Sequence, residues 1–190
     1  MPLRILSYIL GAMRDGTVSI YGKHSHVSIY SRNIQWLEIL KKRFRVVFKR
    51  EPKLYEPRKG TPYIRIYSKG IAEEFVKRFG YKKFWETPKI IKENSEKKTV
   101  LKEYIAGFYD SDGGYDRLKK TVKFYQSWNG RRCPPLEDLK TFLEKLGLST
   151  GKICCYSNRK WNNRFVLRLS VDSSKKFFRI IPVKNDYKVP

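Results

Sequence analysis

The sequence predicts an α+β protein made of two pseudo-symmetric αββαββα repeats, each with a four-stranded antiparallel sheet. Two observations carry this prediction. An apolar phrase that ends in Asp-Gly occurs twice, as YILGAMRDGT from Tyr8 and as YIAGFYDSDGG from Tyr104, about half the chain apart. The same order of strand and helix patterns follows each copy. A phrase and an element order that both recur are typical of a duplicated fold.

In the first half, each predicted element rests on a local pattern. The apolar phrase predicts a buried helix, and polar and apolar residues alternate in the stretches after it, as they do in strands. Asn33 is a suitable N-cap for the next helix, whose apolar residues share one face. The predicted order after the phrase is strand 17–21, strand 26–30, helix 34–44, strand 45–49, strand 63–67 and helix 71–79, which ends at Gly80.

The second half repeats this order after its own phrase. Prolines in a first turn and Gly147 at the end predict a helix over 135–146. Strands are predicted at 121–125, 152–156 and 164–170, and Asp172 is expected to cap a last helix that continues to residue 181. A charged segment that contains Pro88 separates the halves, so the predicted domains are 1–85 and 99–190, with a linker at 86–98.

The charge of the chain points to a polyanionic partner. It has 42 Lys and Arg against 18 Asp and Glu, a formal net charge of +24. Nucleic acid is the leading candidate, because phosphate contacts release counterions; an anionic membrane surface and plain solubility are the weaker interpretations. No apolar run approaches the length of a membrane span. Three cysteines without metal-ligand spacing fit free thiols in a reducing cytoplasm, where the chain would lie on the nucleoid.

Alternation along the strands predicts that each sheet has a basic, aromatic face open to solvent and an apolar face under the helices. Such a face suits a DNA groove, because Arg and Lys bind guanine edges and phosphates while Tyr, Ser and His donate and accept hydrogen bonds. One such strand fits an ordinary solvated face, whereas four in a duplicated basic fold favour nucleic acid. The predicted DNA-binding residues are Lys23, His24, His26, Ser28, Tyr30, Arg32, Arg65, Tyr67, Lys119, Lys120, Lys123, Tyr125, Arg131, Arg132, Arg159, Lys160, Arg164 and Arg168.

Small residues in both phrases predict that the two phrase helices pack closely against each other. Gly11 and Ala12 lie in the first, and Ala106 and Gly107 in the second. Glycine inside a helix normally lowers helix stability by about 1 kcal/mol relative to alanine, so its presence there needs a reason. The reason is that small residues let the backbones of two helices approach closely.

Close packing of the phrase helices would bring Asp15 and Asp112 together at the helix ends. If Asp-Gly occurred only once in this position, the simpler interpretation would be that it ends a helix. Two copies at matching places favour a shared purpose. Neighbouring carboxylates repel each other, and a divalent cation with hard oxygen ligands, Mg²⁺ or in second place Mn²⁺, offsets the repulsion. Two aspartates in a basic groove therefore predict metal-assisted phosphodiester hydrolysis.

The stretch IAGFYDSDG from Ile105 resembles the LAGLIDADG motif of homing endonucleases, and the whole chain is similar to the single-chain, two-repeat archaeal members. The resemblance implies that the motif helices form the interface between the repeats and that the two sheets form a saddle over DNA. It also implies metal contacts at the acidic positions and the adjacent glycines, which are Asp15, Gly16, Asp112 and Gly113 in this sequence.

The resemblance also implies catalytic residues outside the motifs. Members of the family often carry a Gln at the end of the second strand of a repeat to position water, and Gln126 fits that place. The matching residue of the first half is Ser31, a departure from the pattern. A lysine assists the chemistry in the family; the motif does not place it, and Lys69 and Lys123 are candidates ahead of Lys23.

The first motif is one residue shorter than the second between its glycine and its aspartate. One residue is a 100° turn of an α-helix, so either the glycine contact or the aspartate shifts, unless the last turn tightens to 3₁₀. Arg14 also stands where the second copy has the small Ser111. Both departures would suit a nickase or a relative that only binds.

The function predicted from these features is that of a monomeric, metal-dependent endonuclease that cuts both strands of DNA at a long asymmetric site. Two unlike halves argue for an asymmetric target, since protein symmetry mirrors site symmetry. The alternative is a weakened or inactive relative that acts as a nickase, an intron RNA maturase or a DNA-binding regulator, because RNA also accepts a basic surface. A basic protein of membrane surfaces or ribosomes would explain the charge and not the repeat. The presence of both aspartates favours the enzyme.

Overall fold

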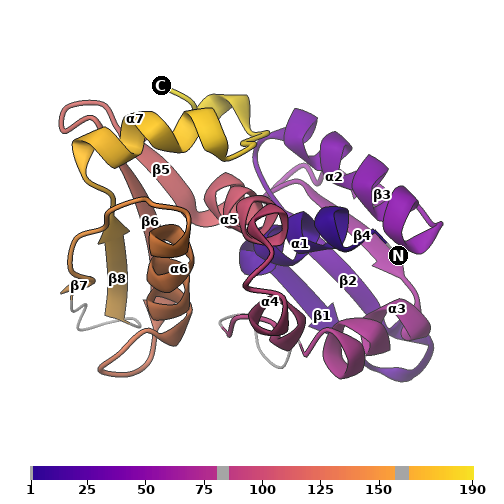
Figure 1. Ribbon diagram of the computed structural model, residues 1–190. Helices are drawn as coiled ribbons and strands as arrows, with labels where there is room; N and C mark the ends of the chain where they lie inside the picture. Colours follow the sequence, from indigo (N-terminus) through magenta and orange to yellow (C-terminus); the bar gives the residue numbers. More distant parts are fainter. Residues whose placement is uncertain (1, 81–85, 157–162) are drawn as a thin grey trace.

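The computed structural model describes residues 2–80, 86–156 and 163–190, and these form two similar halves around a central pair of helices (Figure 1). In the first half, the helices are α1 (Leu3–Ala12), α2 (Ile34–Phe48) and α3 (Lys69–Glu73), and the strands are β1 (Gly16–Ser19), β2 (His26–Tyr30), β3 (Lys53–Tyr55) and β4 (Tyr63–Tyr67). Short 3₁₀ turns lie at Met13–Asp15 and Gly22–His24, and a π-helical turn at Glu74–Arg78 follows α3.

The second half follows the same order after the short helix α4 (Lys89–Glu93). Its helices are α5 (Lys98–Asp112), α6 (Pro134–Lys145) and α7 (Val171–Ile180), and its strands are β5 (Gly113–Asp116), β6 (Thr121–Trp128), β7 (Cys154–Tyr156) and β8 (Asn163–Arg168). A 3₁₀ turn at Asp186–Lys188 lies near the C-terminus.

The two sheets have identical topology, which confirms the predicted fold class. Their strand orders are β1-β2-β4-β3 and β5-β6-β8-β7, and every pairing is antiparallel. Val27 and Ile64 of one sheet and Phe124 and Leu167 of the other are buried under the helices, as the alternation predicts. No helix in the described part of the chain is long and apolar enough to cross a bilayer.

The predicted strand at 45–49 is wrong, because α2 continues to Phe48 and the third strand begins only at Lys53. Phe44 and Phe48 stack near Phe75 of the closing helix, so this segment buries more apolar surface as a helix than it would at a sheet edge. The helix ends at Lys49, whose φ of 55° is left-handed.

Helix caps follow the sequence with one exception. Asn33 caps α2, because its side chain accepts a hydrogen bond from the backbone N–H of Trp36 at 3.1 Å. Asp172 does not cap the last helix. The cap is Ser170, whose Oγ accepts from the N–H of Ser173 at 3.2 Å, and Asp172 lies in the first turn instead.

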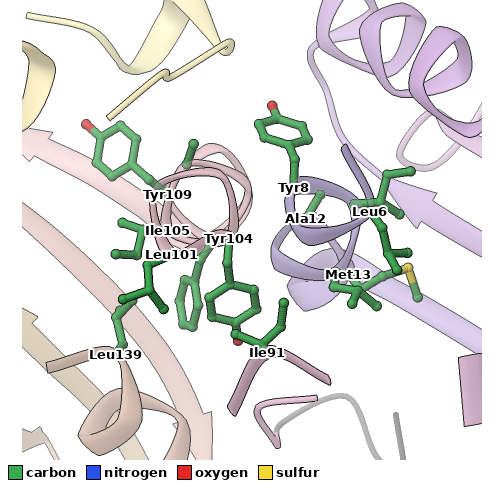
Figure 2. Close-up of a cluster of buried hydrophobic side chains, with 14 of the residues drawn as sticks. Leu6, Tyr8, Ala12, Met13, Ile91, Leu101, Tyr104, Ile105, Tyr109 and Leu139 are labelled. Atoms are coloured by element: carbon green, nitrogen blue, oxygen red, sulfur yellow. The ribbon is translucent and has the colours of Figure 1, made fainter. Parts of the chain in front are cut away.

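The central pair is α1 packed against α5 at backbone contact distance (Figure 2). A Cβ atom added at Gly11 would lie 2.1 Å from the backbone oxygen of Tyr104, and one added at Gly107 would lie 2.1 Å from that of Tyr8. Ala12 and Ala106 are fully buried beside them. The small-residue interface predicted from the two phrases is therefore present, and glycine is required on both sides of it.

Candidate active site

The shorter first motif is compensated by local geometry. Met13–Asp15 form a 3₁₀ turn after α1, whereas the second motif stays α-helical to Asp112. A 3₁₀ step rises about 2.0 Å against about 1.5 Å for an α step, so four steps from Gly11 and five from Gly107 both climb about 7.5 Å. The tighter winding also recovers about 60° of the missing 100°. Asp15 therefore reaches the level of Asp112 at the end of the helix pair.

Two cavities open at this end of the pair, and Asp15 lines both. The first, about 450 Å³, is called here the Gln126 cavity, and the second, about 540 Å³, the Lys188 cavity. The Gln126 cavity is lined by Arg14, Asp15, Asp112, Tyr125, Gln126, Ser127 and Arg164. The Lys188 cavity is lined by Asp15, Tyr30, Ser31, Arg32, Asn33, Thr61, Asp110, Ser111, Asn185, Tyr187 and Lys188.

The two aspartates are electrostatically strained. Burial and, next, the charge of Asp15 raise the pKa of Asp112 to about 7, against the opposing charges of Arg14, Lys188 and Arg164. Burial also raises the pKa of Asp15, against the opposing charge of Lys188. Two half-buried carboxyl groups that repel each other form a site that a cation would stabilise.

We expect Asp112→Asn to stabilise the metal-free protein at neutral pH. A carboxyl group with a raised pKa keeps a proton in the folded chain that the unfolded chain releases, so its ionisation penalty begins as the pH rises through 3.8 and is complete above about pH 7. The gain in free energy of unfolding should be about 1 kcal/mol at pH 4.5 and should rise to about 3–4 kcal/mol at pH 8. Denaturant unfolding in EDTA measures it, with Asp172→Asn, whose side chain is 98% exposed, as control. A gain that does not change with pH would contradict this interpretation.

Arg14, which the sequence marks as a departure, does not block the site. Its guanidinium crosses to the second half, donates to the backbone oxygen of Glu86 at 2.8 Å and to the Tyr104 hydroxyl at 3.3 Å, and lies 5.0 Å from the ring centre of Phe108. It also donates to Oε1 of Gln126 at 3.4 Å. The buried Arg14 thus supplies positive charge beside Asp112 and holds Gln126.

Gln126 lies where the sequence places it, on the opposite phase from Lys123 and Tyr125, buried at the edge of the Gln126 cavity. Its Nε2 donates to the backbone oxygen of Ser127 at 3.3 Å. Ser31, the matching residue of the first half, lines the Lys188 cavity instead. The two sides of the aspartate pair therefore differ chemically.

The lysines expected near the aspartates are not there. Lys69 is exposed at the start of α3, Lys23 is exposed in the 3₁₀ turn before β2, and Lys123 pairs with Asp116. None of the three lines either cavity.

Sequence reasoning missed Lys188, which the C-terminal segment brings to the end of α5. Its Nζ donates to the backbone oxygens of Ser111 and of Tyr109, the latter at 3.3 Å, and the Tyr109 hydroxyl donates back to the Lys188 oxygen at 2.6 Å. Burial lowers the pKa of Lys188, against the opposing charges of Asp15, Asp112 and Asp110. No local motif marks this lysine, because the return of the chain creates its position.

Asp110 anchors this C-terminal segment. Its carboxylate accepts from the backbone N–H of Lys184 at 2.8 Å and of Asn185 at 3.2 Å, and from the hydroxyl of Tyr8 at 2.5 Å. Asn33 donates to the side chain of Asn185 at 2.7 Å, so the segment also reaches the first half, as its path toward α2 shows (Figure 1).

The outer face of the first sheet is basic and aromatic, with one correction. Ser28 is completely buried and lies beneath Arg65, whose Nε donates to its Oγ at 2.8 Å, so Ser28 supports that arginine and is not itself available to a ligand. The hydroxyls of Tyr67 and Tyr30 accept from the same guanidinium at 3.1 and 3.4 Å. His26 pairs in register with Tyr67 at the end of this face.

The outer face of the second sheet carries a similar set. Arg164 lies over the ring of Tyr125 at 4.4 Å, and Lys123 is in register with Arg168, which donates to the Tyr156 hydroxyl at 3.3 Å. The loop residues of the predicted set that are exposed are Lys23, His24, Arg32, Lys119, Lys120, Arg131 and Arg132. Arg159 and Lys160 lie outside the described residues.

The donor set at the aspartates fits a divalent metal ion. Asp15 and Asp112 are hard oxygen donors, and Gly16 and Gly113 follow them in extended backbone, although neither glycine lines the two cavities. Among the described residues, no group of three or more His, Cys, Asp and Glu side chains could hold a metal. Two carboxylates would have to share their ion with backbone oxygens, water or a ligand.

Comparison with known proteins identifies relatives of this chain, although no family model matches it. Homing endonuclease I-ApeI of Aeropyrum pernix is 28% identical over 191 residues, which cover 96% of this chain and 83% of the relative. The crystal structure of I-DmoI in complex with DNA and Mn has a TM-score of 0.67 at 16% identity and covers 94% of this chain and 96% of that one.

The same fold occurs in a further solved structure, full-length DUF199/WhiA from Thermatoga maritima. Its TM-score is 0.62 at 12% identity, covering 97% of this chain and 57% of that one. The sequence relative is named a homing endonuclease, and the two-sheet fold around a glycine-packed helix pair matches I-DmoI. The chain is therefore similar in sequence to a protein named a homing endonuclease, and it shares its fold with I-DmoI.

Proposed function

We propose that this chain is a site-specific endonuclease that hydrolyses both strands of DNA with a divalent metal ion, Mg²⁺ in the first place. The observation that carries the proposal is the convergence of Asp15 and Asp112 at one end of the helix pair, where they line a cavity with Gln126. The names of I-ApeI as a homing endonuclease and of the I-DmoI complex with DNA and Mn support it.

The side chains of Asp15 and Asp112 would hold the ion, with the backbone at Gly16 and Gly113 as further oxygen donors. When bound, it would activate water and stabilise the oxygen that leaves. Gln126, fixed by Arg14 at 3.4 Å, would orient the attacking water through its side-chain amide.

The outer faces of the two sheets would bind the duplex on either side of the cut. The guanidinium of Arg65 is already held by three hydroxyls, so little conformational entropy would be lost when it meets a phosphate or a base edge. We propose that one chain acts alone, with residues 1–85 and 99–190 each contacting one half of an asymmetric site. Its place would then be on the nucleoid in the cytoplasm.

A second candidate function is a DNA-binding regulator without cleavage. The same fold occurs in DUF199/WhiA, whose name does not describe an endonuclease, so the fold by itself does not require cleavage. The two acidic residues at the cavity favour the nuclease, since a protein that only binds DNA gains nothing from two half-buried carboxyl groups that repel each other. An RNA partner is a third possibility that the basic sheet faces also fit.

The deciding experiment is incubation with duplex DNA of the host locus from which the intron is absent. With Mg²⁺ the proposal expects one discrete break in both strands, and with Ca²⁺ in place of Mg²⁺ it expects binding without cleavage. Specific binding without cleavage in Mg²⁺ and in Mn²⁺ would support the regulator. Tighter binding to intron RNA than to the duplex would support a maturase.

DNA affinity should fall steeply with salt. A chain with a net charge of +24 that contacts 6–10 phosphates should lose about 10³-fold or more in affinity between about 50 and 200 mM salt. Fluorescence anisotropy with a labelled duplex in Ca²⁺ measures this dependence. Arg164→Ala should lower the slope by about one, while Lys175→Ala in α7 serves as the control outside the strand faces. A flat salt response would contradict the electrostatic argument.

A further inference from the structure

Lys188 stands out because its ammonium group faces the aspartates without forming an ion pair with any of them. In the described chain, no carboxylate oxygen lies within 4.0 Å of its Nζ, yet Lys188, Asp15 and Asp110 line the same cavity of about 540 Å³. The ammonium is instead held by the backbone oxygens of Ser111 and Tyr109. The Lys188 ammonium and the Asp15 carboxylate therefore line one cavity without neutralising each other. A phosphate could bind to the ammonium there, and a metal ion to the carboxylate.

The position of Lys188 is built by many contacts. The Tyr109 hydroxyl donates to the backbone oxygen of Lys188 at 2.6 Å. The Asp110 carboxylate accepts from the backbone N–H groups of residues 184 and 185, earlier in the same segment. Asn185 is buried, and its side chain donates to the Asp110 backbone oxygen at 3.0 Å. These contacts fix the C-terminal segment on the second motif helix before any ligand binds.

The two cavities therefore carry different cations on the two sides of the aspartate pair. The Gln126 cavity has Arg14 and Arg164, whereas the Lys188 cavity has Ser31 in place of a Gln, with Arg32 and Lys188 as its cations. A cut in both strands of a duplex needs one reacting phosphate on each strand. The two cavities share Asp15 and differ in their other residues, so each could bind the reacting phosphate of one strand.

We propose that Lys188 is the phosphate-binding cation of the Lys188 cavity and acts on one strand of the duplex. This assignment rests on the proposed function, since the phosphate it would bind is that of DNA. Its ammonium would contact a non-bridging oxygen of the phosphate and stabilise the negative charge that builds up there. The other strand would depend on Gln126 and Arg14.

Strand-resolved cleavage tests the assignment. A duplex labelled differently on its two strands is cut in Mg²⁺, and the rate of each strand is followed separately. Lys188→Met should slow one strand by about 10²-fold while the other changes less than about threefold, so nicked DNA accumulates. Gln126→Ala should slow the opposite strand. Lys188→Arg, which keeps the cation, should recover a large part of the lost rate.

A second readout does not need cleavage. Loss of one phosphate contact should lower the slope of log affinity against log salt by about 0.9 when Lys188→Met is compared with the unchanged chain in Ca²⁺. Lys184→Met, four residues earlier in the same segment, is the matched control and should keep the slope and both strand rates. Denaturant unfolding of Lys188→Met establishes that the variant is folded.

The outcomes separate this proposal from the proposed function. If the unchanged chain binds DNA and does not cut it, the proposed function fails, while the slope of Lys188→Met still decides the phosphate contact. A folded Lys188→Met variant with an unchanged slope and unchanged rates on both strands would overturn the assignment. Equal slowing of both strands would overturn its restriction to one strand.

Discussion

Asp112→Asn should abolish DNA cleavage and leave DNA binding nearly unchanged. The substitution removes one of two carboxylates that would hold the metal ion, and an amide is a far weaker ligand for Mg²⁺. The cleavage rate of a saturated complex should fall by at least about 10²–10³-fold. The affinity for the duplex in Ca²⁺ should stay within about threefold, because Asp112 carries no positive charge and lies at the cavity instead of on a strand face.

This prediction has a built-in control against misfolding. Because burial and the charge of Asp15 raise the pKa of Asp112 to about 7, the same variant is expected to be more stable than the unchanged chain at pH 8. Loss of activity together with a gain in stability identifies a functional carboxylate. The exposed Asp172→Asn should change neither quantity. Loss of binding together with cleavage would count against a role in holding metal.

Gly107→Ala should destabilise the whole protein. The added Cβ would lie 2.1 Å from the Tyr8 backbone oxygen and 2.8 Å from the Ala12 nitrogen, and backbone atoms cannot swing aside as side chains can. The helix pair would have to separate. Over-packing of a tight core costs about 1–3 kcal/mol and more where backbone must move, so we expect a loss of about 3 kcal/mol or more in the free energy of unfolding.

Gly70→Ala is the matched control for this substitution. Gly70 is also helical, in α3, and a Cβ added there would meet nothing within 4 Å. The alanine should therefore stabilise the chain by about 0.5–1 kcal/mol, as it does in open helical positions. Denaturant unfolding of both variants gives the comparison. Equal stability of the two variants would show that the helix pair tolerates separation and would remove the reason for its glycines.

Separation of the helix pair would also affect the site. Asp15 lies on one chain segment and Asp112 on the other, so even a small shift moves the two carboxylates apart. If Gly107→Ala remains folded at low temperature, its cleavage rate should fall further than its DNA affinity. The glycines thus link the stability of the fold to the geometry of the metal site.

The parts of the fold that depend on local patterns were predictable from the sequence. The duplicated phrase, the caps at Asn33 and Gly80 and the alternation in β2 and β4 each depend on residues close in sequence, and each is present. The strand predicted at 45–49 is wrong because the β-branched and aromatic run of Val46, Val47 and Phe48 imitates a strand, while Phe48 gains more by packing on Phe75 and Phe79. Tertiary packing overrode the local signal.

In the candidate site, too, residues marked by local sequence signals were predictable and residues placed by tertiary contacts were not. The two aspartates were predictable because each ends a motif, and the position of Gln126 followed from the family resemblance. The 3₁₀ turn that restores Asp15 was one of three outcomes that helix geometry left open. Lys188 was not predictable. It reaches the site because Asp110 holds the returning C-terminal segment through two backbone N–H groups, a contact with no sequence signature. Ser28, placed on the open face by alternation, is covered by the larger Arg65.

Anomalous diffraction from a crystal of this protein with duplex DNA and Mn²⁺ would show directly whether Asp15 and Asp112 hold the metal ion. We expect a manganese peak at about 2.0–2.3 Å from carboxylate oxygens of both aspartates, beside a DNA phosphate. Manganese bound only away from these two side chains, with the duplex in place on the sheets, would contradict this expectation.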